Sequence, residues 1–459
     1  MLSRNKTKPD MTSILSKATD AVRAALMPYQ FGFISGHSYL GERELRSIHA
    51  VMAAQAAAKR REILADYERK FARLVGDGSA VTFASARMAF YALMKALGIG
   101  SGDEVVLPAF TCAVMPNAVM RTGARPVYSD IDGNTCGSDA HAIDSVVTAR
   151  TKLIVAQHSF GIPCDIRAIA DAARRRGIFL VEDCSIALDS SLDGISVGNW
   201  GDAALFSTDH SKPLNTILGG LLYTRNAETL GKVSAFARNL PALSIDHQRR
   251  LYQQLELEKQ IGDPRRYARI LLGTRMRLGF RRLGGSRRAT FLTSDLDAPH
   301  TGGSGHPYPY PAAMPPFLAK LGLYELERWP EEKLKRKRAL TLLLDALERS
   351  PTRVRVPAAY KDAARNITPL RLVFTSPDRN GFLSKLGNII DASGIWFQQP
   401  VIGATRELQT LGYSVGSCPE AERICAEILN LPCALDAEWS RSLAQSLLDA
   451  GLRGAKARD

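Results

Sequence analysis

Lys212 stands in a turn-rich stretch, residues 204–220, that separates two short apolar runs. A lysine amine held at the mouth of a strand can act as a nucleophile toward a carbonyl carbon. Ser207 offers a hydroxyl five residues earlier, and Asp183 offers a carboxylate at the end of an upstream apolar run. The carboxyl ends of strands share one edge of an α/β sheet, where ligands bind, so we expect these three side chains to meet there.

An amine, a carboxylate and a hydroxyl are also what pyridoxal phosphate requires of a protein. The cofactor needs a lysine that forms a Schiff base, an acid beside its pyridine nitrogen, and hydroxyl or amide donors for its phosphate. We therefore assign Lys212 as the catalytic and covalently binding residue, Asp183 as the partner of the ring nitrogen and Ser207 as a phosphate ligand. Each residue taken singly fits an ordinary surface or strand-end position, and it is the combination that indicates a site.

The residues around this site resemble the DegT/DnrJ/StrS-type sugar aminotransferases, a branch of the aspartate aminotransferase (fold type I) superfamily. The shared pattern continues through several further segments, in the family's order, namely 103–111, 123–127, 130–132, 158–161, 181–183, 318–323 and 421–432. The resemblance implies an α/β protein of fold type I. Its large domain has a mostly parallel sheet flanked by helices, and a smaller C-terminal α/β domain follows.

The resemblance also implies a function. It indicates a pyridoxal-phosphate aminotransferase that converts a keto-sugar, nucleotide-linked in this family, into an amino sugar with glutamate as donor. The setting implied is the biosynthesis of surface polysaccharides or of sugars of secondary metabolism, and the assembly implied is a homodimer. A dehydratase-type enzyme on the same fold and a non-catalytic relative that docks to a membrane or an assembly are the alternatives.

The predicted phosphate-binding turn departs from the family pattern. The family has Ser-Gly-Thr where this chain has Ser85, Ala86 and Arg87, directly before an apolar helix predicted over 88–97. A helix N-terminus favours an anion, so Ala86 and Arg87 are assigned to cofactor binding. The Arg87 guanidinium can hold a phosphate with two hydrogen bonds. It could replace both the missing hydroxyl and an asparagine that similar proteins lend from a partner subunit, at about Pro311 here. A surface ion pair is the alternative role for Arg87.

Three further departures surround the cofactor site. Cys112 follows Thr111, where similar proteins often have an aromatic residue that stacks on the pyridine ring; Ile186 replaces a glutamine, and Leu218 replaces a glutamate. These changes bear on which substrate is bound more than on which cofactor is bound, because the lysine, aspartate and serine are retained. His210 stands where it could orient the turn or contact substrate, or simply lie partly exposed, and the related dehydratases carry a histidine in place of the lysine itself.

The order of elements predicts four segments. Residues 1–80 form an N-terminal helical segment and residues 81–239 a βαβ series that binds the cofactor. Residues 240–316 form a basic insertion and linker, and residues 317–459 a small C-terminal domain that begins with a helix over 317–348, punctuated at Pro330. A second helix is predicted over 379–393.

Composition sets the remaining bounds. The chain has 459 residues, 45% of them hydrophobic, and seven cysteines without a C-x2-C pair, so neither a disulfide framework nor a zinc site is indicated. No apolar run is long enough to span a bilayer and no signal peptide is recognised, which indicates a cytoplasmic protein. The net charge is +14.

Part of that charge is concentrated in residues 264–290, where nine arginines and no acid alternate with large apolar side chains. This mixture favours peripheral contact with an anionic membrane or a phosphorylated partner, and a solvated basic loop is the alternative. Nucleic acid is not expected as a partner, because no nucleic-acid-binding motif accompanies the arginines.

Overall fold

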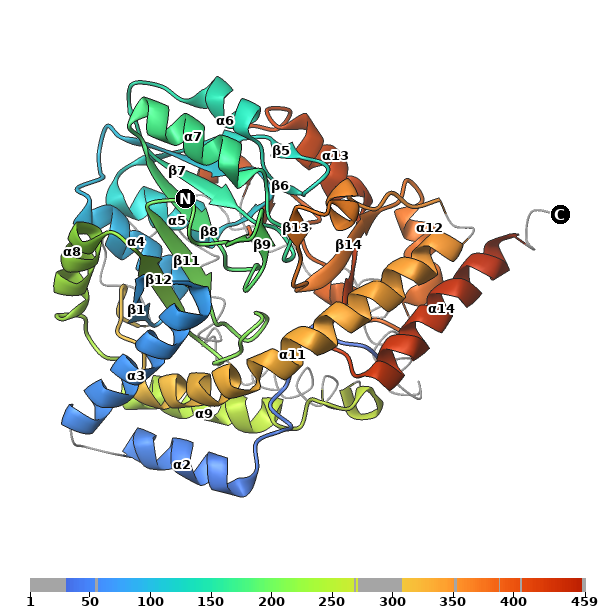
Figure 1. Cartoon of the computed structure of the whole chain (residues 1–459), viewed down its shortest axis with the longest axis horizontal. Coiled ribbons are helices and arrows are strands. Elements are labelled where there is room, and N and C mark those ends of the chain that lie inside the picture. Colours follow the sequence, from blue (N-terminus) through green and yellow to red (C-terminus); the bar gives the residue numbers. More distant parts are fainter. Residues whose placement is uncertain are drawn as a thin grey trace, which may run out of the picture.

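The computed structural model describes residues 30–53, 57–267, 270, 308–350, 353–387, 389–404 and 407–455. In these ranges the chain builds a large α/β part around one seven-stranded sheet, and the C-terminal residues form a smaller α/β part joined to it by a long helix, α11 (Figure 1).

The central sheet is mostly parallel, as the sequence predicted. Its strand order is β1-β12-β11-β8-β7-β2-β4, and β12 is the strand that runs against both of its neighbours. The strands are β1 (Ser79–Phe83), β2 (Glu104–Pro108), β4 (Arg125–Ser129), β7 (Thr151–Gln157), β8 (Phe179–Asp183), β11 (Ala203–Ser207) and β12 (Gly220–Thr224). The parallel strands therefore place their carboxyl ends at one edge.

Helices cover both faces of this sheet because both faces are apolar. Successive strand residues point to opposite sides, so Val106 and Ile154 pack beneath α6 and α7, whereas Val105 and Val155 belong to the main core. The flanking helices are α4 (Ala86–Ala96), α5 (Val114–Thr122), α6 (Ala140–Val146), α7 (Ile166–Arg176) and α8 (Ala227–Ala237).

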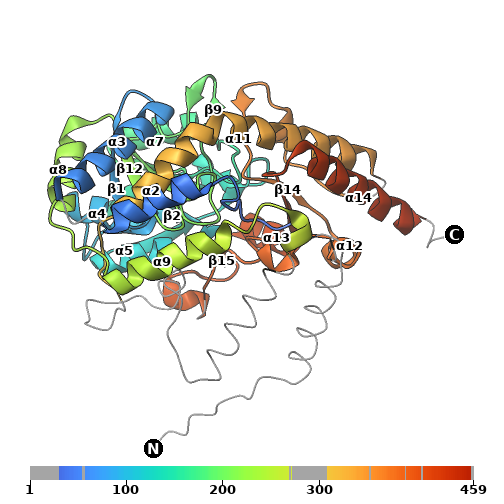
Figure 2. The same ribbon diagram turned by 90° about the horizontal axis from the view of Figure 1, so that it is seen from below.

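Helix α11 (Pro316–Arg349) connects the two parts of the molecule. It contacts α2 (Glu42–Ala53) and α3 (Ala57–Val75) along one portion and α14 (Ala437–Ala455) along another, as Figure 2 also shows. The predicted long helix is confirmed, and it continues through Pro330 without a break.

The small part pairs β14 (Arg371–Thr375) with β16 (Ile428–Pro432) in antiparallel fashion and adds α12 (Arg379–Leu386), α13 (Pro419–Glu427) and α14. The prediction of a helix over 379–393 is wrong beyond Leu386. Ile390 instead forms a parallel bridge with Phe31, and the Asp391 amide donates to the Phe31 carbonyl at 2.9 Å. This pairing with a distant segment holds the backbone out of the helix.

The segment predicted as a basic insertion begins with an ordered helix, α9 (Ile245–Glu258), which buries Leu251, Leu255 and Glu258. Most of the arginine-rich stretch predicted over residues 264–290 lies outside the described residues. The boundaries 1–80, 81–239, 240–316 and 317–459 remain predictions.

Short elements complete the chain. They are β3 (Thr111–Cys112), β5 (Ile131–Asp132), β6 (Gly137–Ser138), β9 (Ser191–Leu192), β10 (Ile195–Ser196), β13 (Arg365–Asn366), β15 (Val401–Ile402), and 3-10 turns at Ala358–Lys361, Ala392–Gly394 and Leu408–Leu411. Among the described helices, none combines the length and the apolar character needed to cross a bilayer.

Candidate active site

A cavity of about 470 Å³ opens at the carboxyl edge of the parallel strands. It is lined by every residue that the sequence assigned to the site: Lys212, Asp183, Ser207, Ala86 and Arg87. Asp183 ends β8, Ser207 ends the neighbouring strand β11, and Lys212 lies in the loop that follows β11. The adjacency of β8 and β11 brings together residues that lie far apart in sequence.

The Lys212 side chain is partly exposed to this cavity. Its Nζ lies 4.8 Å from the centroid of the Trp396 ring. Burial lowers the pKa of Lys212 from its ordinary value, although Asp209, Cys112 and Asp183 act in the opposite direction. The amine therefore spends more time unprotonated, the form that attacks a carbonyl carbon.

Asp183 is buried and presents its carboxylate to the same cavity. Among the described residues it accepts one hydrogen bond at the side chain, from the Ser185 amide to Oδ1 at 2.9 Å. Its partner in the ladder is Gln157, which also lines the cavity and donates from Nε2 to the Phe110 carbonyl at 2.8 Å. Gln157 was not assigned to the site from the sequence, although its place at the end of an apolar strand could have indicated it.

The first turn of α4 forms another wall. Ser85 is the N-cap residue, yet its buried Oγ has no hydrogen-bond partner among the described residues. Gly220 approaches this turn so closely that a Cβ there would lie 2.0 Å from the Ala86 nitrogen. A helix N-terminus with an unused buried hydroxyl is suited to an anion, and the buried Arg87 side chain adds positive charge.

An aromatic wall comes from residues 395–403, which the sequence analysis had placed in the C-terminal domain without a role. Strand β15 pairs with β3, so Trp396 and Phe397 are carried to the cavity. Phe397 stacks on Phe110 with ring centroids 4.1 Å apart. Strands β3 and β15 have only two residues each, too few for a periodic hydrophobic pattern. The sequence therefore did not reveal this wall.

The three departures from the family pattern fall in different places. Cys112 and Ile186 line the cavity, whereas Leu218 is fully buried in the core and does not line it. Burial raises the pKa of the Cys112 thiol, which keeps it protonated and unreactive at neutral pH. His210 does not line the cavity and instead faces Glu258 of α9, at 3.6 Å from Nδ1 to Oε1.

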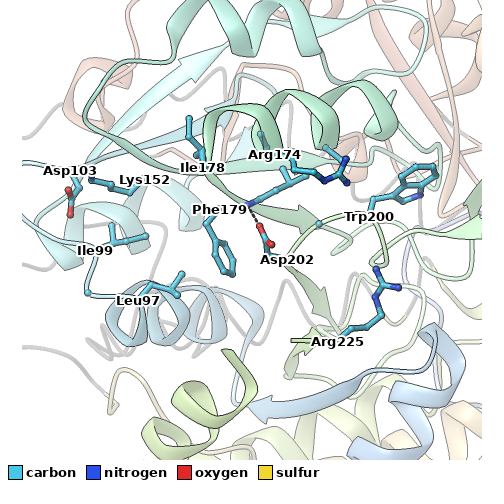
Figure 3. Close-up of a pocket in the computed structure, with 16 residues that line it drawn as sticks. Leu97, Ile99, Asp103, Lys152, Arg174, Ile178, Phe179, Trp200, Asp202 and Arg225 are labelled. Carbon is cyan, nitrogen blue, oxygen red and sulfur yellow. Dashed lines mark hydrogen bonds between the residues drawn. The ribbon is translucent and has the colours of Figure 1, made fainter. Parts of the chain in front are cut away.

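A larger cavity, of about 860 Å³, lies at the opposite edge of the sheet, where the parallel strands begin (Figure 3). It is lined by charged and apolar side chains, among them Lys152, Arg174, Trp200, Asp202 and Arg225. No residue predicted for chemistry borders it. The candidate active site is therefore the smaller cavity, which both Lys212 and Asp183 line.

His158, Glu182 and Cys184 form a buried group beneath the sheet edge. Glu182 accepts bonds from His158 Nε2 at 3.0 Å and from the backbone amides of Gly198, Trp200 and Gly201, and His158 Nδ1 accepts from the Cys164 amide. These bonds occupy the lone pairs that a metal ion would need, so the group has a structural role.

The comparison with known families agrees with this geometry. The model of the DegT/DnrJ/EryC1/StrS aminotransferase family matches residues 38–278, just over half of the chain. The chain belongs to this family. The family match includes Lys212, Asp183, Ser207, Ala86 and Arg87, and it continues through α9.

Curated relatives of this family member include the spore coat polysaccharide biosynthesis protein SpsC of Bacillus subtilis, 34% identical over 46% of this chain and 52% of the relative. A GDP-perosamine synthase of Escherichia coli O157:H7 is 37% identical over 36% of this chain and 45% of the relative. The chain thus spans about half the length of the curated relatives it matches.

Solved structures extend the similarity of fold to nearly the whole chain. DesI, solved in the presence of its TDP-sugar product, gives a TM-score of 0.67 at 21% identity and covers 96% of this chain and 100% of its own. The aminotransferase TlmJ of Streptoalloteichus hindustanus gives 0.66 at 23% identity, covering 94% and 99%. The predicted fold class is confirmed.

Family membership indicates pyridoxal phosphate as the cofactor. The donor set of the cavity fits this group. A lysine amine whose pKa is lowered by burial, a carboxylate that accepts one bond, and a helix N-terminus with the buried Ser85 hydroxyl supply the three types of contact that the cofactor requires.

Proposed function

We propose that this protein is a pyridoxal-phosphate-dependent aminotransferase that moves an amino group from an amino acid, glutamate, to a keto-sugar carried on a nucleotide. The observation that carries the proposal is the single cavity at the sheet edge into which Lys212, Asp183 and the first turn of α4 all face.

Each side chain has a separate task in this proposal. The bound cofactor supplies an aldehyde that takes up the amino group and a ring that withdraws electrons from the donor's α-carbon. Lys212 holds the cofactor through Nζ and afterwards accepts and returns a proton at that atom. The Asp183 carboxylate keeps the ring nitrogen protonated, because opposite charges stabilise one another. Ser207, Arg87 and the amides of α4 bind the phosphate.

The aromatic wall contributes by limiting water around the amine. Trp396 covers Lys212 from the side of the small part, and Phe397 is locked against Phe110. A drier site strengthens the interaction between Asp183 and the cofactor ring.

The names of further relatives support a nucleotide-linked keto-sugar as substrate. A UDP-N-acetyl-3-dehydro-alpha-D-glucosamine 3-aminotransferase and a dTDP-4-dehydro-2,3,6-trideoxy-D-glucose 4-aminotransferase are each 36% identical to parts of this chain. We also propose that the protein works as a homodimer in the cytoplasm, with peripheral membrane contact through residues 264–290, and that it takes part in amino sugar biosynthesis for polysaccharides or secondary metabolites.

Substitution of the lysine tests the assignment directly. Purified protein titrated with pyridoxal phosphate should develop the visible absorption band of the lysine-bound cofactor, and the loaded protein should convert glutamate to its keto acid when a nucleotide-linked keto-sugar is supplied. Lys212→Ala should lack the band and lose activity by at least about 10²–10⁴-fold, the contribution of a positioned proton-transfer group.

Lys232→Ala, on the exposed surface of α8, is the matched control and should behave as the wild type. A Lys212→Ala variant that keeps both the band and the activity would refute the assignment. Wild-type protein that never develops the band would refute the proposed function and favour a non-catalytic docking role.

A further inference from the structure

The loop that carries Lys212 is held by buried polar contacts on both sides of the lysine. At its base, Thr216 donates from its amide to the Thr208 carbonyl at 2.8 Å, and the two threonine hydroxyls lie 2.6 Å apart. These bonds close the loop at its ends, and within it the Lys212 amide donates to the Asp209 carbonyl at 2.9 Å. Contacts from outside the loop add to these bonds.

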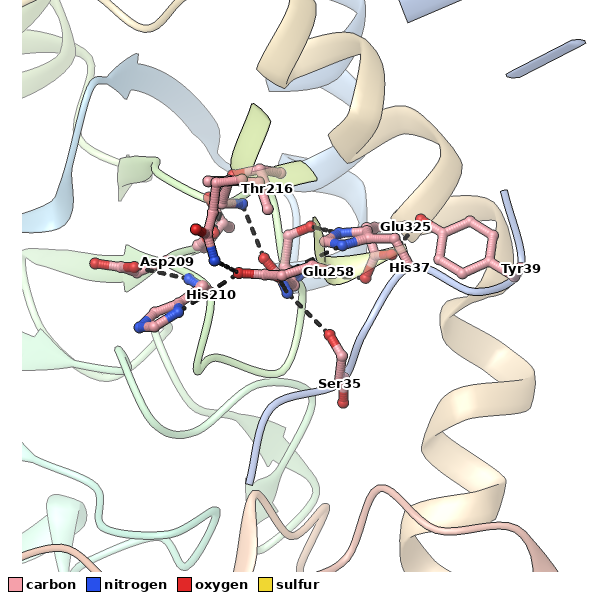
Figure 4. A network of polar contacts seen from close by, with 12 residues as sticks. Ser35, His37, Tyr39, Asp209, His210, Thr216, Glu258 and Glu325 are labelled. Carbon is pink, nitrogen blue, oxygen red and sulfur yellow. Dashed lines mark hydrogen bonds and ion pairs between the residues drawn. The ribbon is translucent and has the colours of Figure 1, made fainter. Parts of the chain in front are cut away.

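Glu258, the last residue of α9, provides such contacts (Figure 4). Its side chain is fully buried, and its Oε2 accepts a hydrogen bond from Asn215 Nδ2 at 2.8 Å. Its Oε1 lies 3.6 Å from His210 Nδ1. One carboxylate thus contacts the residue two positions before Lys212 and the residue three positions after it.

The charges in this cluster favour the ionised carboxylate. Burial alone raises the pKa of Glu258, but hydrogen bonding and charge from His210 and the nearby His37 outweigh it and leave the pKa below its usual value. The pKa of His210 is raised above its ordinary value. Burial and the charge of Lys212 lower this pKa, but the hydrogen bonding and charge of Glu258 and the charge of Asp209 outweigh them. Both shifts favour an ion pair between Glu258 and His210, whose facing atoms lie 3.6 Å apart.

The same contact supports a strained backbone position. Ile217 has a φ of 67°, a left-handed conformation that costs free energy for a β-branched residue. Its amide donates to Asn215 Oδ1 at 2.8 Å, and the other end of the Asn215 amide group is the one bound by Glu258. His37 also donates from Nε2 to the Asn215 carbonyl at 2.8 Å. Glu258 is thus placed to hold the loop in a conformation that it would not keep alone.

We infer that Glu258 is a positioning residue for Lys212, which fixes the lysine loop through His210 and Asn215 so that the amine projects into the cavity. The inference rests on the proposed function, in which Lys212 is the residue that binds the cofactor. It assigns a task to α9, which lies in the segment predicted as an insertion.

Glu258→Gln tests this role, because the glutamine side chain carries no charge and has only one oxygen that can accept hydrogen bonds. In cofactor-free protein, the pKa of His210 measured by NMR should fall, because its anionic partner is gone while Asp209, Lys212 and His37 remain. With pyridoxal phosphate added, the rate at which the visible band forms should fall by about 10- to 100-fold, as expected for a misplaced reacting group. His210→Asn identifies the His210 resonance among the eight histidines.

Glu256→Gln is the matched control, because it makes the same change at an exposed position of the same helix. If Glu258→Gln and Glu256→Gln give the same His210 pKa and the same rate of band formation, the inference is wrong. Should Glu258→Gln fail to fold, His210→Asn takes its place in the rate measurement, and a wild-type rate in that variant overturns the inference. A wild-type protein without the band would refute the proposed function, whereas the His210 titration is independent of the cofactor.

Discussion

Arg87 is the residue whose assignment most needs an experiment, because it replaces the hydroxyl residue that the family pattern has at the phosphate turn. It lies buried in the first turn of α4 and borders the cavity. Arg87→Ala should weaken the affinity for pyridoxal phosphate by about 1.5–3 kcal/mol, the usual contribution of a hydrogen bond to a charged group. Equilibrium titration followed by absorbance measures this change.

Lys95→Ala is the control for this prediction, since it removes a positive charge from the exposed last turn of the same helix. It should leave the affinity unchanged. An unchanged affinity in Arg87→Ala as well would assign that side chain to the packing around α4 and not to the phosphate.

At the scale of residues, the sequence pointed to groups that the proposed chemistry requires but not to residues that only the packing of the fold brings near them. Lys212, Asp183 and Ser207 were assigned because their types and spacing match one cofactor, and all three line the cavity. Trp396 and Glu258 were not found. Trp396 is brought to the cavity by the pairing of two very short strands, β15 and β3. Glu258 lies 46 residues after Lys212, in a helix whose sequence carries no local signal of a role at the site.

The close approach of β12 to α4 is an element-scale feature with a measurable consequence. A Cβ on Gly220 would meet the backbone of Ser85 and Ala86 at 2.0–2.4 Å, so the strand and the helix would have to separate. Gly220→Ala should lower the free energy of unfolding by about 1–3 kcal/mol, the range for overpacking a core, and should also weaken cofactor binding. Urea denaturation and the absorbance titration measure the two effects.

Gly231→Ala serves as the control for this substitution. Gly231 lies in α8 with open space around it, so alanine there should raise helix stability by up to about 1 kcal/mol and leave cofactor binding unaltered. Wild-type stability and affinity in Gly220→Ala would show that the turn is not held as tightly as the structure indicates.

Elements were predictable where they carry their own signal. The apolar strand runs and the long helix before and after Pro330 were recognised from composition and periodicity. The predicted helix over 379–393 failed because Phe31, more than 300 residues away in sequence, pairs with Ile390 and competes with helical hydrogen bonds. A contact of that range overrides local propensity and leaves no trace in the segment itself.

On the scale of the whole molecule, the sequence of the basic segment 264–290 predicts binding to anionic membranes. Each basic group near an anionic surface contributes about 1 kcal/mol, so several arginines together should bind acidic vesicles at low salt. Raising the salt to about 1 M should release most of the protein, because the Debye length falls to about 3 Å. Co-sedimentation with acidic vesicles measures the binding, and neutral vesicles provide the comparison.

The variant for this test has to keep the beginning of the segment. The Tyr267 hydroxyl donates to Asp391 Oδ2 at 3.0 Å, and Arg265 lies 5.4 Å from the ring centroid of Trp439, so deleting these residues would disturb the small part. Replacing only the arginines from 275 to 288 by glutamine avoids this. If that variant and the wild type pellet equally with acidic vesicles at low salt, the segment is not a membrane anchor.

The contacts of residues 31–37 also set the order in which the molecule can be assembled during its synthesis. Phe31 bridges to Ile390, and the His37 amide donates to the Glu258 carbonyl at 2.9 Å. These early residues leave the ribosome long before their partners exist, and nascent domains otherwise fold from the N-terminus onward. A growing chain that has already made the lysine loop still lacks α9, and the bridge from Phe31 cannot form until residue 390 has emerged. A ribosome-bound chain of about 300 residues, which has residue 258 but lacks residue 390, should therefore leave the segment around Phe31 more open to protease than the complete chain does.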